Sequence, residues 1–425
     1  MSNDTNPINP VMDVPSEDIG MNFDQYADVL TNFLVAADPP QLTIGIFGGY
    51  GTGKTTLMDA IDKKLPSIHK KNNKPITSVW FNAWRHDKEE HLFLPFLASI
   101  NRKLPKDDPS LKKKFMAASM AFIRNSSFEL NAGFIKQSFN AEKMIKAEED
   151  YLKNNIERQL DGYQDVYEIL KGITCDNNEL QHNIIVFIDD LDRCLPDKAF
   201  ALVEALKSYM DIKGFMFVIG LDPRVIESYI TKKYGDDYCI DAEEYLQKII
   251  QVPFYLPKVT GEEIQKELEK IFTSDFDLIS SIKEPLLKLY NFFPRNIRQI
   301  KRLLNMYQSI NQAMIYNTSD DDFEPETLLS LLILQLRWPI VYWIYQDSRE
   351  EFDSFITEIR DLESDQGIDT KWNKYQNTIQ SIKNDKDFHD FFENVMYSSM
   401  RFSVAEKHLR YLGWPINIET MFMRI

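Results

Sequence analysis

A glycine-rich stretch at residues 44–57 holds the residues of this chain that are best suited to chemistry. Gly48, Gly53, Lys54 and Thr55 match the spacing G-x-x-x-x-G-K-[ST] of a phosphate-binding loop. Glycines let a backbone turn tightly enough to point several N–H groups at a phosphate, and a following helix adds its positive N-terminal end. The spacing therefore predicts a nucleotide site formed by Gly48, Gly49, Tyr50, Gly51, Thr52, Gly53, Lys54, Thr55 and Thr56.

The predicted site needs cations for the phosphates and oxygen ligands for a metal ion. Lys54 is the expected point charge for the β- and γ-phosphates, and the Thr55 hydroxyl is an expected Mg²⁺ ligand. ATP and Mg²⁺ are therefore the predicted cofactors.

An acidic segment at residues 183–193 is the second candidate for chemistry. Five apolar residues, 184–188, precede Asp189 and Asp190, and such a run suits a strand buried on both faces of a parallel sheet. Asp189 is the expected metal partner opposite the phosphate-binding loop. Asp190 stands where many ATPases of this kind place a Glu that orients the attacking water, so it is a candidate catalytic residue although it is shorter by a methylene.

Several neighbouring residues allow two interpretations each. Asp192 and Arg193 could form a local ion pair, which we favour slightly, or could face the γ-phosphate. Asp222 could sense the γ-phosphate or cap the helix expected from Pro223. Trp84 follows a predicted strand, and we favour core packing over a role at the site, with His86 expected at the surface.

A basic stripe at residues 295–302 is the third candidate. Arg298 and Arg302 are i, i+4 neighbours on an expected helix, and Arg295 lies one turn earlier. Arg295 and Arg298 are candidate catalytic residues because an arginine here could reach the nucleotide phosphates. The alternative is a solvated face paired with local acids.

The elements expected to position these residues alternate along the chain. Apolar segments at 42–47, 76–82, 184–188, 215–221 and 250–256 predict strands, and helical patterns lie between them. This alternation predicts a three-layer α/β/α parallel sheet with a helical insertion and a C-terminal helical region. One strand is expected between the strand of the phosphate-binding loop and the acidic strand.

The domain organisation follows from shifts in composition. We expect a mobile tail at 1–22, a core at 23–258 with a helical insertion at 106–183, a helical lid at 259–318, and a C-terminal helical domain at 319–425. The amphipathic segment 23–36 could wall an adenine pocket or could pack in the core.

Composition excludes some functions. The chain has 425 residues, 44% of them hydrophobic, and its net charge of −16 disfavours nucleic-acid binding over the whole surface. Three distant cysteines, Cys175, Cys194 and Cys239, predict a reduced cytoplasmic compartment and no zinc site. The apolar run 328–345 contains Arg337 and Pro339, so we expect two buried helices there and no integral membrane span.

Five motifs in order resemble the KAP family of P-loop NTPases over residues 23–345. They are Gly48–Thr55, Phe81-Asn82-Ala83-Trp84, Asp189-Asp190-Leu191-Asp192-Arg193, Gln251-Val252-Pro253-Phe254 and Pro294-Arg295-Asn296. Many members carry transmembrane helices between the two nucleotide motifs, whereas the 106–183 insertion here is polar. The resemblance implies Mg-ATP binding by Gly48–Thr55 with Asp189, and a helical lid that bears Arg295 or Arg298.

The resemblance also implies settings and partners. Members are linked to phage exclusion and to signalling scaffolds, so we expect an ATP-hydrolysing switch whose C-terminal region contacts a second copy or a protein effector. Two alternatives stay open. One is a nucleotide-gated scaffold without turnover, with the acidic segment 347–369 as a partner surface. The other is a small-molecule phosphotransferase.

Overall fold

The computed structural model describes residues 23–68, 74–89, 92–103, 162–177, 179–234, 242–273, 282–317, 325–347, 352, 355–356 and 376–396. The predicted tail 1–22, the insertion from 106 to 161, Cys239 and most of the acidic segment 347–369 lie outside these residues. The chain divides into two compact units, with the break between Pro257 and Lys258.

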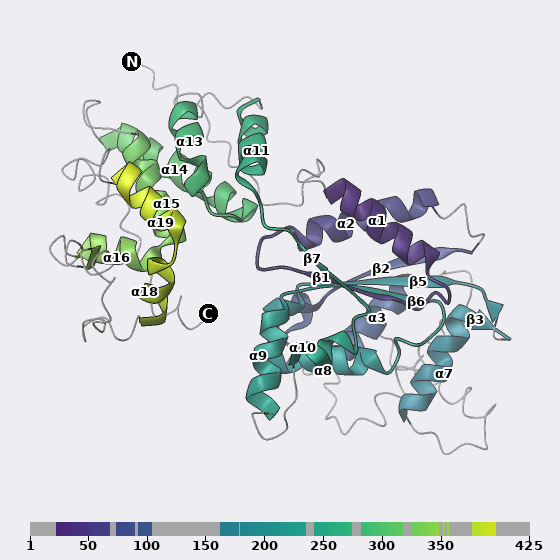
Figure 1. The fold of residues 1–425 in the computed structure, drawn as a ribbon. Coiled ribbons are helices and arrows are strands. Elements are labelled where there is room, and N and C mark those ends of the chain that lie inside the picture. The colour runs from purple at the N-terminus through teal and green to yellow at the C-terminus, as the bar shows by residue number, and fades with distance from the viewer. Residues whose placement is uncertain are drawn as a thin grey trace. The chain divides into compact units, whose positions relative to one another are not determined.

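A five-stranded parallel sheet forms the centre of the first unit, as predicted (Figure 1). Its strand order is β2-β5-β6-β1-β7. The strands are β1 (Thr43–Phe47), β2 (Ile76–Asn82), β5 (Asn183–Asp189), β6 (Phe215–Leu221) and β7 (Val252–Tyr255). Because β6 lies between β1 and β5, the expectation of one intervening strand is confirmed.

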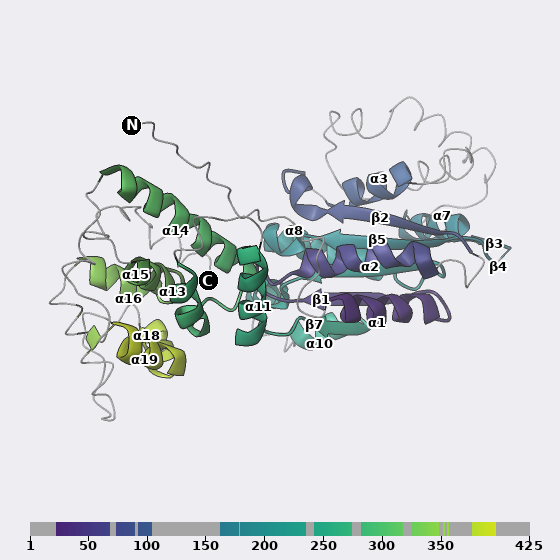
Figure 2. The same ribbon diagram turned by 90° about the horizontal axis from the view of Figure 1, so that it is seen from above.

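Helices cover both faces of this sheet, and the two cores follow from side-chain alternation along the strands. Helices α1 (Phe23–Ala36) and α2 (Lys54–Ile68) lie side by side on one face and pack on Ile185 and Phe187 (Figures 1 and 2). The other face packs Ile184, Val186 and Ile188 against the remaining helices. Those helices are α3 (Phe93–Lys103), α7 (Gly162–Thr174), α8 (Pro196–Lys207), α9 (Pro223–Tyr234) and α10 (Ala242–Gln247). Helix α1 therefore belongs to the core, as one of its two interpretations expected.

The carboxyl ends of the parallel strands place the candidate residues at one edge of the sheet. Strand β1 leads into the phosphate-binding loop and α2, and β5 leads into the short helix η3 (Leu191–Arg193). Strand β2 leads into η2 (Ala83–His86), and its last residue Asn82 stands beside Asp189 in the register. Ligands bind at this edge in open α/β sheets, because side chains from neighbouring strand ends meet there.

A small antiparallel pair, β3 (Cys175–Asp176) with β4 (Glu179–Leu180), was not predicted. Each strand has only two residues, which is too short for a sequence pattern to show. The pair lies within the predicted insertion 106–183, after α7.

The second unit is helical throughout its described part. It contains α11 (Gly261–Thr273), α13 (Lys283–Leu289), η5 (Tyr290–Phe292), α14 (Ile297–Asn317), α15 (Pro325–Arg337), α16 (Pro339–Asp347), α18 (Gln376–Lys383), α19 (Lys386–Phe391) and the π-helix η8 (Phe392–Met396). The predicted break at Trp338-Pro339 is confirmed, because α15 ends before Trp338 and α16 begins at Pro339. Among the residues described, no helix combines the length and the apolar character that crossing a membrane requires.

Candidate nucleotide-binding site

The phosphate-binding loop depends on glycine at two positions. Gly51 and Gly53 have φ angles of 76° and 103°, in the region that other residues rarely adopt. A Cβ on Gly53 would lie 2.6 Å from the ring of Phe23 on α1, so α1 packs directly against the loop and leaves no room for a side chain there. Within the loop, the Thr52 hydroxyl donates a hydrogen bond of 2.9 Å to the Gly49 carbonyl oxygen.

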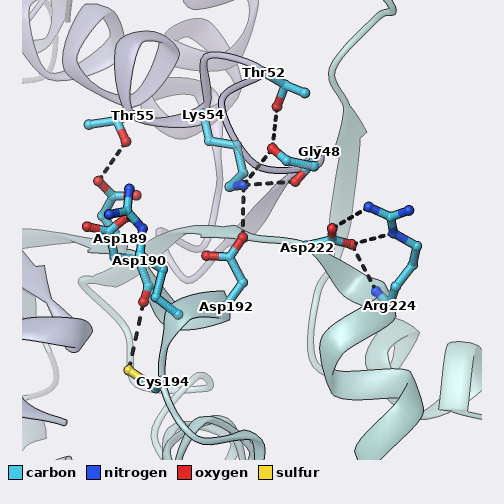
Figure 3. Close-up of polar contacts among 12 residues, drawn as sticks. Gly48, Thr52, Lys54, Thr55, Asp189, Asp190, Asp192, Cys194, Asp222 and Arg224 are labelled. Carbon is cyan, nitrogen blue, oxygen red and sulfur yellow. Dashed lines mark hydrogen bonds and ion pairs between the residues drawn. The ribbon is translucent and has the colours of Figure 1, made fainter. Parts of the chain in front are cut away.

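Lys54 begins α2, and its ammonium group lies inside the loop. The Nζ atom contacts the carbonyl oxygens of Gly48 and Gly49 at 2.8 and 3.1 Å, and the Asp192 carboxylate at 2.9 Å (Figure 3). The side chains of Lys54 and Asp192 are each 10% exposed, so both charges are largely removed from solvent. A buried ammonium group with three acceptors is poised to exchange one of them for a phosphate oxygen.

Thr55 and Asp189 meet across the site. The Thr55 hydroxyl donates a 2.8 Å hydrogen bond to Asp189 Oδ2, although 134 residues separate them (Figure 3). The other oxygen, Asp189 Oδ1, is buried and accepts no hydrogen bond from the described residues. A hydroxyl oxygen beside an unpartnered carboxylate oxygen is a donor set that suits Mg²⁺.

The environment of Asp189 disfavours its negative charge. Burial raises the pKa of its carboxyl group, the neighbouring Asp190 raises it further, and the Thr55 hydrogen bond and the Lys54 charge only partly oppose this. A bound cation would relieve this cost, so the electrostatics agree with a metal site.

Asp190 is held at both carboxylate oxygens. Its backbone is left-handed, with φ 56° and ψ 29°, which is unusual for a residue other than glycine. Arg193 Nε donates to Oδ1 at 2.8 Å, and Asn82 Nδ2 donates to Oδ2 at 2.7 Å. Asn82 is itself oriented, because its Oδ1 accepts a 3.1 Å hydrogen bond from the backbone N–H of Arg85.

Each of the three neighbouring aspartates therefore has a different partner. The favoured Asp192–Arg193 ion pair was wrong, because Asp192 pairs with Lys54 and Arg193 with Asp190. Asp192 and Arg193 are neighbours in the short helix η3, but they meet different partners from elsewhere in the chain. Asp192 pairs with Lys54, and Arg193 stacks on Tyr50 and Trp84. Asn82 was not among the predicted site residues; its position at the end of a strand was the signal that could have found it.

Trp84 was predicted to pack in the core, and this was wrong. It is 52% exposed, because it follows β2 in the turn η2 beyond the edge of the sheet. The guanidinium carbon of Arg193 lies 5.2 Å from the centre of the Trp84 ring and 5.2 Å from that of Tyr50, which is 61% exposed. His86 is partly buried and stacks on Phe81 with ring centres 5.4 Å apart.

Asp222 directly follows β6, the strand that lies between β1 and β5. It accepts a 3.2 Å hydrogen bond from the backbone N–H of Arg224 in the first turn of α9, as a helix cap does, and pairs with the Arg224 guanidinium at 2.6 Å (Figure 3). Burial raises its pKa, but the hydrogen bonds and charge of Arg224 outweigh this and lower the pKa overall. Sequence reasoning missed Arg224, whose Nη2 is 3.4 Å from where a Cβ on Gly49 would lie.

Cys194 follows η3 and is buried. Its Sγ lies 3.8 Å from the Asp190 carbonyl oxygen, and burial, with nearby carboxylates, raises the pKa of the thiol to about 12. The thiol is therefore protonated at neutral pH.

Arg295 and Arg298 belong to the second unit. Arg295 donates to the Asn291 carbonyl oxygen at 3.1 Å and lies 3.8 Å from Asp387. The Arg298 backbone N–H donates to Asn296 Oδ1 at 3.0 Å at the start of α14. All of these contacts lie within the second unit. The catalytic role of Arg295 and Arg298 stays a prediction.

Comparison with known proteins identifies the family. The model for the KAP family P-loop domain matches residues 23–314, so the chain belongs to the KAP family of P-loop NTPases. Nucleotide binding follows from this membership. The Phage T7 exclusion protein of Escherichia coli K12 is 24% identical over 240 residues, which cover 53% of this chain and 31% of that protein.

Two solved structures are similar at a coarser level. The ORC2 protein of Aeropyrum pernix in its ADP form has 12% identity and a TM-score of 0.39, with 91% of this chain and 87% of that chain covered. A Walker-type ATPase of Pyrococcus abyssi has 11% identity and a TM-score of 0.37, with 95% and 99% covered. Scores this low carry no conclusion about function, and the parallel sheet described above defines the fold by itself.

Proposed function

We propose that the chain is a Mg²⁺-dependent ATP-hydrolysing switch. The observation that carries the proposal is the 2.8 Å contact between Thr55 and Asp189, with Lys54 in the same loop. It joins the end of β5 to the start of α2, and thereby assembles a phosphate-binding loop, a metal-ligand pair and a cation at one edge of the sheet.

The residues divide the work of hydrolysis among them. The backbone N–H groups of Gly48–Thr56 and the Lys54 ammonium bind the phosphates, while Thr55 and Asp189 would hold Mg²⁺, which neutralises charge on the β- and γ-phosphates when bound. Asp190 orients the attacking water. Arg295 or Arg298 in the helices of 259–318 would respond to the γ-phosphate and so change the state of the C-terminal helices, which act on a second copy or on a protein effector.

Phosphate release from Mg-ATP by the purified chain tests the proposal. Lys54→Ala is expected to lower the rate by about 100-fold or more, because one preorganised charge-stabilising group is lost. Lys63→Ala is the matched control on the same helix, since its side chain is 57% exposed and pairs with Asp59 one turn earlier. Equal rates in Lys54→Ala and the wild type would rule the proposal out.

A nucleotide-gated scaffold is the second candidate, and the residue type at position 190 favours it. Asp190 is shorter by a methylene than the Glu that many such ATPases use to orient water, so its carboxylate reaches less far. A protein that binds Mg-ATP with a Lys54-dependent affinity but releases no phosphate would be this scaffold.

The setting we propose is defence against phage. Its support is the sequence similarity to the Phage T7 exclusion protein, which covers about a third of that protein's length. Cells that carry the intact gene, compared with cells that carry the Lys54→Ala variant, should differ in plaque formation by a panel of phages. Equal plaque counts in both would contradict this setting.

A further inference from the structure

An arginine held between two exposed aromatic rings lies next to the water-orienting residue of the proposed site. Tyr50 comes from the phosphate-binding loop, Trp84 from η2 after β2, and Arg193 from η3 after β5. The Arg193 guanidinium carbon is 5.2 Å from both ring centres. We propose that Arg193, clamped by Tyr50 and Trp84, is a positioning residue that fixes the Asp190 carboxylate for hydrolysis; this rests on the proposed ATPase activity.

The contacts of Asp190 support a positioning role. A carboxylate oxygen has two acceptor sites, and Arg193 Nε occupies one on Oδ1 while Asn82 Nδ2 occupies one on Oδ2. Fixing both oxygens sets the plane of the carboxylate and leaves an acceptor site on each for a water molecule. An aspartate is shorter than the glutamate often found here, so its reach depends more strongly on this orientation.

The rings explain how an arginine near the surface can be held firmly. The Arg193 side chain is 28% exposed, and a long side chain at that exposure normally samples many rotamers. A planar guanidinium stacks on aromatic faces, and two rings restrict it more than one. Tyr50 is 61% and Trp84 52% exposed, and both rings face Arg193 at the edge of the site.

The geometry also separates this role from binding of the nucleotide. Lys54 is the cation that contacts the loop carbonyl oxygens, whereas Arg193 is paired with Asp190 and stacked on rings. Loss of Arg193 should therefore slow turnover more than it weakens ATP binding.

Steady-state phosphate release is the test. Arg193→Ala is expected to lower kcat roughly 10- to 100-fold, with KM for ATP changed less than about threefold, as for a misplaced reacting group. Trp84→Ala should lower kcat by roughly 3- to 10-fold, and Trp84→Phe, which keeps a ring, should recover most of the loss. Arg85→Ala is the matched control, because this exposed arginine lies in the same turn and contacts Asn82 only through its backbone.

The double variant Arg193→Ala with Trp84→Ala gives a second, independent readout. It should be no slower than Arg193→Ala alone, because the ring acts only through the arginine. Additive losses would overturn the proposal. So would an Arg193→Ala enzyme as fast as the wild type or faster, or one in which KM rises while kcat is unchanged.

The outcomes keep this proposal apart from the proposed function. A wild-type chain without Lys54-dependent phosphate release defeats both. An active wild type with an unaffected Arg193→Ala variant defeats the positioning role alone. Because Trp84 is 52% exposed, the Trp84→Ala and Trp84→Phe pair keeps the test decisive even if Arg193→Ala folds poorly.

Discussion

Within the part of the chain that the structure describes, each unit contains an assembly of an arginine, a tryptophan and an aspartate. In the first unit Arg193 stacks on Trp84 and pairs with Asp190. In the second, Arg337 stacks on Trp338 with its guanidinium carbon 4.4 Å from the ring centre, and pairs with Asp387 at 2.9 Å. The ingredients are the same, but their surroundings differ.

The assembly in the second unit is built into a core. Trp338 is 4% exposed, packs on Phe388 and Phe391, and donates from Nε1 to Asp385 at 2.9 Å. Asp385 also caps α19 by accepting from the backbone of Phe388. These contacts join the end of α15 and Trp338, which follows it, to α19 and its cap, so the assembly stabilises the helical unit.

The assembly in the first unit lies in exposed turns after β2 and β5, not in a core. Trp84 is 52% exposed, Asp190 has a left-handed backbone, and the phosphate-binding loop supplies the second ring. Strain and exposure at such a place are costs for stability, and proteins keep them where function needs them. The comparison shows that residue types alone do not assign a role; burial and neighbours do.

The two tryptophans give the largest expected contrast. Trp338→Ala should lower the free energy of unfolding by about 3–5 kcal/mol, because a fully packed ring is removed. Trp84→Ala should lower it by less than about 1 kcal/mol, since only a solvent-facing stack is lost. Urea unfolding followed by far-ultraviolet circular dichroism measures both free energies. Similar losses in the two variants would contradict the comparison.

The Asp189 carboxylate, the proposed Mg²⁺ ligand, should affect activity without lowering stability. Asp189→Asn is expected to lower Mg²⁺-dependent phosphate release by roughly 100-fold or more, because it removes a metal ligand. The raised pKa of Asp189 means that its stabilising effect on the fold exists below the unfolded value of 3.8 and is lost as pH rises through the folded pKa. At pH 7 the neutral asparagine should therefore leave the unfolding midpoint unchanged or higher; a marked drop would contradict this.

Arg337 allows the comparison to be tested in the second unit. Arg337→Ala should lower the free energy of unfolding by about 1–3 kcal/mol, less than for a fully buried pair because the Asp387 side chain is 41% exposed. ATP affinity of the first unit should not change. Arg302→Ala, an exposed arginine on α14, is the matched control and should stay within about 0.5 kcal/mol of the wild type.

The smallest expected effect concerns pH. Asp222 has a lowered pKa, so its ionised form stabilises the fold above the unfolded value of 3.8, and this stabilisation is lost as pH falls through the folded pKa. Asp222→Asn keeps a capping residue but no charge, and should cost less than about 1 kcal/mol at pH 7, because the Arg224 side chain is 77% exposed. The difference in unfolding free energy between Asp222→Asn and the wild type should shrink at pH 3. A difference that grows at pH 3 would contradict the lowered pKa of Asp222.

Much of the fold was predictable because its signals are local. The run Ile184–Ile188 predicted a buried strand, and glycines at fixed spacing predicted the loop before α2. Pro339 predicted where α15 and α16 separate. Each of these signals acts within a few residues of the structure that it determines.

The partners at the site were less predictable because they depend on long-range contacts. Asn82 and Asp190 are 108 residues apart, and Thr55 and Asp189 are 134 residues apart. No local pattern could state that Asp192 would pair with Lys54 while Arg193 paired with Asp190. The wrong expectation for Trp84 has the same cause, since its exposure depends on where β2 ends beside β5.

The sequence by itself therefore determined the class of the protein, the phosphate-binding loop and the acidic strand end, because glycine spacing and apolar runs act on the nearby backbone. Only the tertiary structure decided which charge each aspartate meets, and that Tyr50 and Trp84 hold Arg193. The physical reason is that parallel strands bring distant strand ends to one edge of the sheet, where partners are chosen by distances that the order of residues does not contain.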